Sequence, residues 1–148
     1  MREIKFQIYW IAGHEMLYDT NNDLEFRDKE NYWITDLSDA INQPERYKVR
    51  QYTGLKDKNG VEIYEGDIDQ AENGDKSVIV FLLKAGTYCV MPMDIYLNND
   101  YQNESFFPDF IYGFGYDLFF DNCTPDKYLN IIGNIYENPE LLEEEPTC

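Results

Sequence analysis

Carboxylates are the most abundant side chains in this sequence that could carry out chemistry. The 148 residues include 29 Asp and Glu against 12 Lys and Arg, for a formal net charge of −17. Two carboxylates that converge in a pocket can serve as the acid and base of a hydrolase or bind its metal ion. A small carboxylate- or metal-dependent hydrolase is therefore one hypothesis that the composition leaves open.

Asp67 stands out among these acids because it lies between Gly66 and the start of an expected strand. A carboxylate at such a position commonly accepts hydrogen bonds from nearby backbone N–H groups and so fixes a turn. We therefore interpret Asp67 as a structural residue rather than a catalytic one.

The other patterns associated with catalysis or metal binding are incomplete. His14 is the single histidine, which argues against the usual zinc sites and against a Ser-His-Asp arrangement. Residues 19–25 alternate oxygen-bearing side chains as a calcium loop does, but Leu24 stands where that loop requires glycine. Residues 113–118, GFGYDL, lack the remaining glycine and the Lys-Ser/Thr of a phosphate loop. We predict no catalytic residue, no metal site and no cofactor.

The cysteines and the apolar segments indicate a cytosolic protein. Cys89, Cys123 and Cys148 are far apart and odd in number, so they indicate neither a disulfide framework nor a zinc site. The sequence shows no signal peptide and no long apolar run. The surplus of acids also disfavours direct binding to nucleic acid or to an anionic membrane, because both require Lys and Arg.

The acidic residues are distributed unevenly along the chain. Residues 1–68 hold 14 acids and 9 bases, whereas residues 69–148 hold 15 acids and 3 bases. Acids interleaved with aromatic residues can form a protein-binding face, because charge steers the encounter and rings anchor the partner. The competing interpretation is a surface that only keeps the protein soluble. The candidate partner-binding residues are Asp94, Asp100, Glu104, Asp109, Asp117, Asp121 and Asp126.

The elements that would position these residues are mostly short strands. The continuous apolar run at 77–83 predicts a central strand that is covered on both faces. Helical signals are confined to 35–42 and to one turn at 140–142. Alternating or aromatic-rich segments predict further strands at residues 4–10, 47–51, 61–65, 88–93 and 128–136.

Six residues are expected to form turns or bends between these strands. Asn59-Gly60 is a strong signal for a two-residue hairpin turn, because both residue types tolerate positive φ. The remaining glycines mark other tight turns or bulges, and Gly133 is expected to let the last strand bend. The complete set is Gly54, Asn59, Gly60, Gly66, Asp67 and Gly133.

Two segments resemble signature stretches of the YopX-like family of phage and prophage proteins. They are YTGLKDKNGVEIYEGDI at residues 52–68 and IIGNIYENPELL at residues 131–142, and the opening MREIKF with the later MLYD fits the family's N-terminal hairpin. The resemblance implies a mainly β fold in a phage-related setting. It implies no activity, because the family has no established catalytic residues to transfer.

The strand and turn signals together predict one mainly β domain over residues 1–142, followed by an acidic tail at 143–148. We expect a small bent sheet or a barrel-like YopX-type domain with one or two short helices.

Composition and resemblance together favour a non-catalytic acidic binding protein encoded by a phage or prophage. It would work in the cytoplasm of a bacterial host and engage a basic host nucleic-acid-binding protein by imitating an array of phosphates. The alternatives are the hydrolase and a homo-oligomeric structural protein, whose self-association would use its aromatic residues and sheet edges.

Overall fold

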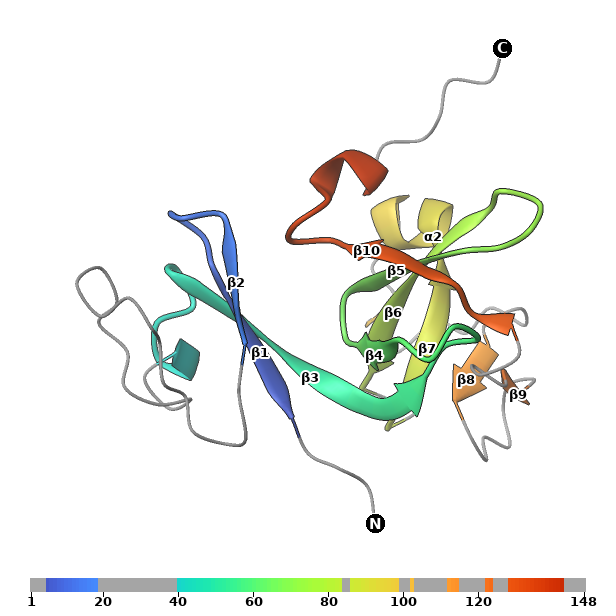
Figure 1. The fold of residues 1–148 in the computed structure, drawn as a ribbon, viewed down its shortest axis with the longest axis horizontal. Coiled ribbons are helices and arrows are strands. Elements are labelled where there is room, and N and C mark those ends of the chain that lie inside the picture. Colours follow the sequence, from blue (N-terminus) through green and yellow to red (C-terminus); the bar gives the residue numbers. More distant parts are fainter. Residues whose placement is uncertain are drawn as a thin grey trace. The chain divides into compact units, whose positions relative to one another are not determined.

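The computed structural model describes residues 5–18, 40–83, 86–98, 102, 112–114, 122–123 and 128–142. The backbone groups into two compact units, Met1–Tyr52 and Thr53–Cys148, whose elements are labelled in Figure 1. The predicted mainly β fold is confirmed. A single domain over residues 1–142 stays a prediction. The acidic tail and most of the helix expected at 35–42 lie outside the described residues.

The first unit is built on an antiparallel sheet. β1 pairs with β2 on one side and with β3 on the other, so that Ile8 faces both Leu17 and Val49 across the sheet. Ile8, which has no exposed surface, fills the centre of this unit. The strands are β1 (Phe6–Trp10), β2 (Glu15–Tyr18) and β3 (Tyr47–Lys56), and β3 continues into the second unit.

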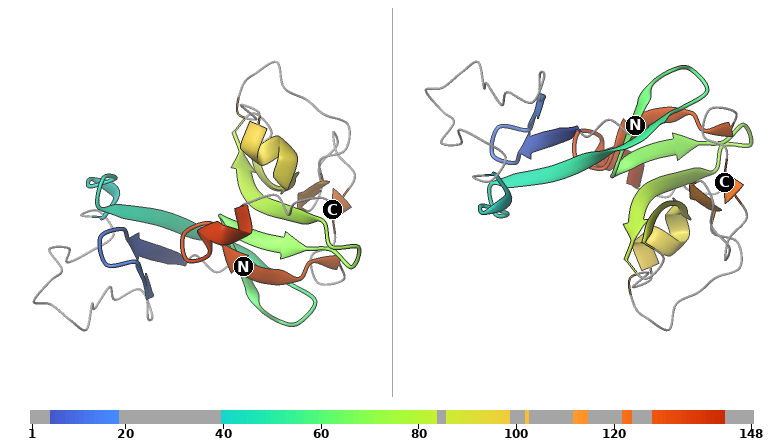
Figure 2. Two further views of the ribbon diagram at one scale, coloured as in Figure 1. Left: turned by 90° about the horizontal axis from the view of Figure 1, so that it is seen from above. Right: turned by 90° about the horizontal axis from the view of Figure 1, so that it is seen from below.

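The second unit holds β4 (Glu62–Tyr64), which extends the first sheet in the order β2-β1-β3-β4, and a separate six-stranded sheet. The order of the second sheet is β10-β5-β6-β7-β8-β9, with β8 and β9 parallel and the other pairs antiparallel. Figure 2 shows how the sheet curls. Its strands are β5 (Asp67–Gln70), β6 (Lys76–Leu82), β7 (Thr87–Pro92), β8 (Tyr112–Phe114), β9 (Asn122–Cys123) and β10 (Ile131–Asn134).

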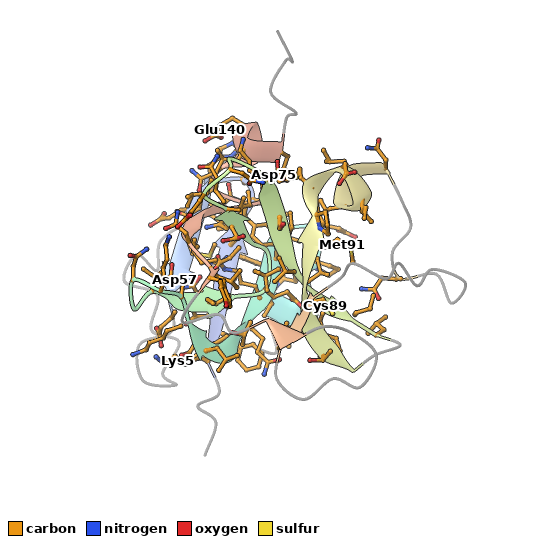
Figure 3. The ribbon with its side chains drawn as sticks, turned by 90° about the vertical axis from the view of Figure 1, so that its right-hand side faces the viewer. Lys5, Asp57, Asp75, Cys89, Met91 and Glu140 are labelled. Atoms are coloured by element: carbon orange, nitrogen blue, oxygen red, sulfur yellow. The ribbon has the colours of Figure 1, made fainter. Side chains whose placement is uncertain are left out.

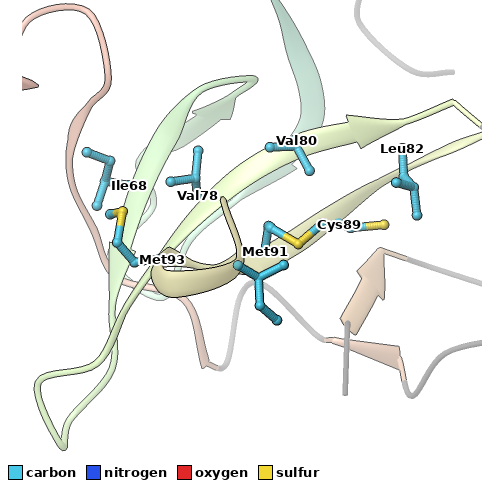
Figure 4. Close-up of a cluster of buried hydrophobic side chains, with 8 residues drawn as sticks. Ile68, Val78, Val80, Leu82, Cys89, Met91 and Met93 are labelled. Atoms are coloured by element: carbon cyan, nitrogen blue, oxygen red, sulfur yellow. The ribbon is translucent and has the colours of Figure 1, made fainter. Parts of the chain in front are cut away.

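β6 is buried on both faces, as the apolar run at 77–83 predicts. Because successive side chains alternate across a strand, Val78, Val80 and Leu82 lie on one face and Ile79 and Phe81 on the other. The first face packs with Ile68, Cys89, Met91, Met93 and Ile95, most of which Figure 4 labels. The second face packs with Ile63, Tyr88, Val90 and Leu129.

The hairpin between β3 and β4 closes with three residues rather than the two expected. Asp57 N–H donates to the carbonyl of Val61, and Gly60 N–H donates to the carbonyl of Asp57 at 3.0 Å. Gly60 has a φ of 81°, whereas Asn59 is not at positive φ. These features describe a type I turn followed by a left-handed glycine. Val61, expected in the strand, closes the loop just before β4 begins at Glu62 and is exposed.

Gly54 and Gly66 both adopt left-handed backbone conformations, but in different settings. Gly54, which we expected in a turn, lies inside β3 with a φ of 89°, and positive φ within a strand is typical of a bulge or bend. Gly66 has a φ of 86° in the turn between β4 and β5. Its N–H donates to the carbonyl of Ile79 on β6 at 2.7 Å.

Helix α2 (Met93–Asn98) was not expected from the sequence. The predicted strand at 88–93 ends at Pro92, and Met93 begins the helix instead. Six residues are too few to show a helical period clearly. Met93 and Ile95 are buried against the first face of β6, so tertiary packing stabilises this short helix.

The last strand is shorter than the predicted 128–136. The pairing of β10 with β5 shifts register between Ile131 and Gly133. The bend expected at Gly133 stays a prediction. The strand then ends because the Asn134 side chain accepts hydrogen bonds from the backbone N–H groups of Tyr136 and Glu137, at 3.0 and 2.8 Å. A single 3-10 turn, η1 (Pro139–Leu142), follows.

Gly66→Ala should destabilise the protein more than Gly60→Ala. A left-handed conformation costs a non-glycine residue roughly 1–2 kcal/mol at either position, and at Gly66 the added Cβ would also lie 3.1 Å from Tyr136 Cε2. Nothing lies within 4 Å of a Cβ at Gly60. We expect losses of about 2–3 and about 1 kcal/mol, respectively, in the free energy of unfolding. Urea titrations followed by circular dichroism measure the loss for each variant. Equal losses would contradict the conclusion that the close contact with Tyr136 adds to the cost at Gly66.

Candidate functional site

Of the seven acids predicted to bind a partner, the structure describes Asp94. Asp94 is exposed in the first turn of α2, and its backbone carbonyl accepts a hydrogen bond from the Asn98 side chain at 2.8 Å. The other six, Asp100, Glu104, Asp109, Asp117, Asp121 and Asp126, lie outside the described residues.

Further acids of the second unit are exposed on the described surface. They lie in the β5–β6 turn, on α2, and in the segment that follows β10. Figure 3 shows Asp75 and Glu140 at the upper end of the unit, while Asp57 lies among the strands. The exposed carboxylates in question are Glu72, Asp75, Asp94, Glu137 and Glu140.

Asp57 is a buried carboxylate that joins the β3–β4 hairpin to β10. It is 2% exposed. One carboxylate oxygen, Oδ1, accepts hydrogen bonds from the N–H groups of Asn59 and Val61 at 2.8 and 2.9 Å. The other, Oδ2, accepts one from the N–H of Ile131 at 2.9 Å. These three backbone donors replace the hydrogen bonds to water that the carboxylate loses on burial. The role of Asp57 is therefore structural.

Neighbouring contacts strengthen the same junction. Lys58 N–H donates to the carbonyl of Leu129 at 3.0 Å, and the Asn59 side chain donates to Asn130 Oδ1 at 3.0 Å. The hairpin tip and the segment before β10 are thus held together by both backbone and side-chain bonds.

Asp67 has the structural role that its position suggested. It is 3% exposed, and its Oδ2 accepts a hydrogen bond from Tyr64 N–H at 2.8 Å. This bond spans the turn from Tyr64 to Asp67, which contains Gly66. The Asp67 carboxylate is therefore bonded to the backbone of its own turn, which does not favour the catalytic role that a hydrolase would require of it.

Asp69 is the third buried acid among the described residues, and its pKa is raised. Its Oδ1 accepts a hydrogen bond from Asn130 N–H at 2.7 Å. Desolvation by burial raises its pKa above the ordinary value of 3.8; the Asn130 bond and nearby Lys58 oppose this rise, and the charge of Asp57 adds to it. Perturbed carboxylates cluster at functional sites but also in structural networks, and here the bonded partner is backbone.

Among the residues that the structure describes, no three His, Cys, Asp or Glu side chains gather closely enough to hold a metal ion. No helix in the described part of the chain is both long and apolar enough to cross a membrane.

A cavity of about 270 Å³ lies along β6 in the second unit. Its walls come from the β4–β5 turn, from β6, from α2 and from the residues after β10. The side chain of Gln102 completes it. Sequence reasoning missed this feature, because its walls come from segments that only the fold brings together. Its lining residues include Glu65, Gly66, Phe81, Tyr96, Gln102 and Tyr136.

The sequence model of the family described as "YopX protein" matches residues 5–143. The chain belongs to the YopX family. No curated protein matches it. Among solved structures, the crystal structure of protein EF1440 from Enterococcus faecalis is similar, with 26% sequence identity and a TM-score of 0.47 over 97% of this chain and 100% of that chain.

Removing the Asp57 carboxylate from this YopX-family protein should be strongly destabilising. Asp57→Ala leaves three backbone N–H groups without their acceptor, for a loss of about 3–5 kcal/mol in the free energy of unfolding. Asp57→Asn keeps one acceptor oxygen and should lose less. Glu72→Ala, at an exposed position, is the control and should change stability by under about 0.5 kcal/mol. Chemical denaturation measures all three, and a loss at Asp57→Ala no larger than the control would contradict the role.

Asp69→Asn should change how stability depends on pH. Because the folded-state pKa of Asp69 is raised, the folded state holds the proton more tightly than the unfolded chain does. The resulting penalty is absent below the unfolded value near 3.8 and complete above the folded pKa. The variant, which has no ionisation there, should gain stability relative to wild type as pH rises from about 4 to about 7.

Urea titrations at a series of pH values would follow this gain. Glu72→Gln, which also removes one negative charge, serves as the reference for general charge effects. If the difference in free energy of unfolding between Asp69→Asn and wild type stayed constant over this pH range, folding would not change the pKa of Asp69, and the prediction would be wrong.

Proposed function

We propose that this YopX-family protein is a non-catalytic binding protein whose acidic second half engages a basic partner. The observation that carries the proposal is the imbalance of charge, with 15 acids against 3 bases over residues 69–148. In the described part of that region, most acids are exposed rather than buried.

The division of the acids into two groups supports the proposal. Asp57, Asp67 and Asp69 are buried, and each accepts at least one backbone N–H bond. The exposed acids have water around them and are available to a cationic surface. This arrangement favours binding over the alternative of a carboxylate-dependent hydrolase, which needs carboxylates converging in a pocket.

The family's general association with phages and prophages suggests the kind of partner. A bacterial host contains abundant basic proteins that bind nucleic acid, and an array of carboxylates can imitate the phosphates they recognise. We propose that the protein works in the bacterial cytoplasm on such a partner and does not bind nucleic acid or membrane itself.

Capture from bacterial lysate at two ionic strengths tests this function. We expect a basic protein to be retained at about 50 mM salt and released at about 1 M, since the Debye length falls from over 10 Å to about 3 Å. Double-stranded DNA added at low salt should displace the partner if the carboxylates imitate phosphates. Retention of no basic protein at low salt would refute the proposal.

A charge-matched pair of variants should locate the binding face. Neutralising Asp94, Asp100 and Glu104 (to Asn, Asn and Gln) should weaken binding to the captured partner about tenfold at low salt. Neutralising Glu15, Glu45 and Glu72 to Gln removes the same charge elsewhere and should weaken it by about twofold or less. Titration calorimetry gives both constants. Equal effects of the two triple variants would assign the binding to net charge alone.

A further inference from the structure

The edge of β6 that faces β5 is only partly paired. β5 pairs with β6 from Lys76 to Val78, and Gly66 N–H reaches the carbonyl of Ile79. β6 itself continues to Leu82. Because backbone groups alternate along a strand, Phe81 points its N–H and C=O groups to the same side as Ile79. The next residue, two positions on, is Leu83, which lies in the turn after β6. Among the described strands, none pairs with this stretch on that side.

The side-chain amide of Gln102 occupies this stretch. Its Nε2 donates to the carbonyl of Phe81 at 2.7 Å, and its Oε1 accepts a hydrogen bond from Leu83 N–H at 3.0 Å. A primary amide carries the same donor and acceptor as a peptide group. Gln102 therefore bonds to β6 as one peptide group of a neighbouring strand would.

The cavity described above opens beside this edge. Gly66, Phe81 and Gln102 line it together with Tyr96, Tyr136 and Glu65. At about 270 Å³ it lies below the usual 300–1,000 Å³ of small-molecule sites. It suits a single side chain carried by an extended backbone, with aromatic residues and Glu65 among its lining.

We propose that Gln102 is a placeholder at a strand-addition site, where an extended basic segment of the partner protein displaces the glutamine amide and pairs with β6. In such β-augmentation, main-chain bonds give affinity and alternate side chains give specificity. One side chain of the added strand enters the cavity, and its Lys or Arg neighbours point away from it. The inference rests on the proposed function and specifies how the basic partner is bound.

Charge complementarity identifies the occupant. Glu65 lines the cavity, and residues 69–148 hold 15 acids against 3 bases. An acidic segment would be repelled from this region, whereas a basic one is attracted. A second copy of this chain, with its net charge of −17, fits less well than a cationic peptide.

A pair of synthetic peptides of identical charge tests strand addition in the full-length protein. The first is a fluorescein-labelled peptide that alternates Lys and Val. The second has the same sequence with every other backbone nitrogen methylated, which removes the donors on one edge and blocks pairing. We expect the unmodified peptide to bind at least about tenfold more tightly at low salt, because several main-chain bonds are lost in the other. Fluorescence anisotropy measures both affinities.

Two protein variants test the role of the glutamine. Gln102→Ala removes the competing amide, so the unmodified peptide should bind several-fold more tightly. Gln70→Ala makes the same substitution at another glutamine of the same unit, whose side chain bonds the carbonyl of Gly74, and should bind as wild type does. Hydrogen exchange supplies a second measurement: the Leu83 amide should exchange faster in free Gln102→Ala and become protected when the peptide is added.

Each other outcome overturns the inference. Equal binding of the methylated peptide would show that the contact is electrostatic alone, and would leave the proposed function standing. If the unmodified peptide bound neither wild type nor Gln102→Ala at low salt, β6 would not be a strand-addition site. The lysate experiment decides separately whether a basic partner exists. Weaker binding by Gln102→Ala than by Gln70→Ala would make the glutamine a contact rather than a placeholder.

Discussion

The second unit depends on the hydrogen bonds that backbone N–H groups make to the buried carboxylate of Asp57. A buried negative charge is unfavourable unless its lost hydration is replaced, and here the N–H groups of Asn59, Val61 and Ile131 replace it. The three donors come from two segments about 70 residues apart in sequence. The carboxylate thus fixes the loop of one hairpin and, through the same group, the start of the last strand.

This requirement explains why a strongly acidic chain still buries acids. Repulsion at a net charge of −17 favours placing every carboxylate in water. Among the described residues the exceptions are Asp57, Asp67 and Asp69, which lie where turns and strand starts leave backbone donors without partners in the sheet. Asp69 shows the cost of this arrangement, because burial raises its pKa and makes the ionised form less favourable.

The sequence predicted those features that arise from local chemistry. An apolar run without alternation identified β6 as a strand buried on both faces, and glycine with asparagine identified the hairpin. It failed where several contacts compete. The hairpin loop has three residues rather than two, because the Asp57 side chain accepts a hydrogen bond from Asn59 N–H within the loop. Helix α2 forms because two of its side chains, those of Met93 and Ile95, pack into the core. The placement of Gln102 on β6 depends on pairing across about 20 residues, which no local pattern records.

The division between buried and exposed acids also decides which surface can recognise a partner. Carboxylates held by backbone donors have fixed geometry but little capacity to meet another molecule, whereas exposed ones attract cations without selecting among them. Selectivity therefore requires a second element with directional bonds. Under the proposed strand addition, Phe81 C=O and Leu83 N–H, which bond the Gln102 side chain in the structure, would supply such bonds beside the cavity along β6. Under that proposal, long-range attraction would bring many basic chains to the unit, and short-range pairing would then retain those that can extend as a strand.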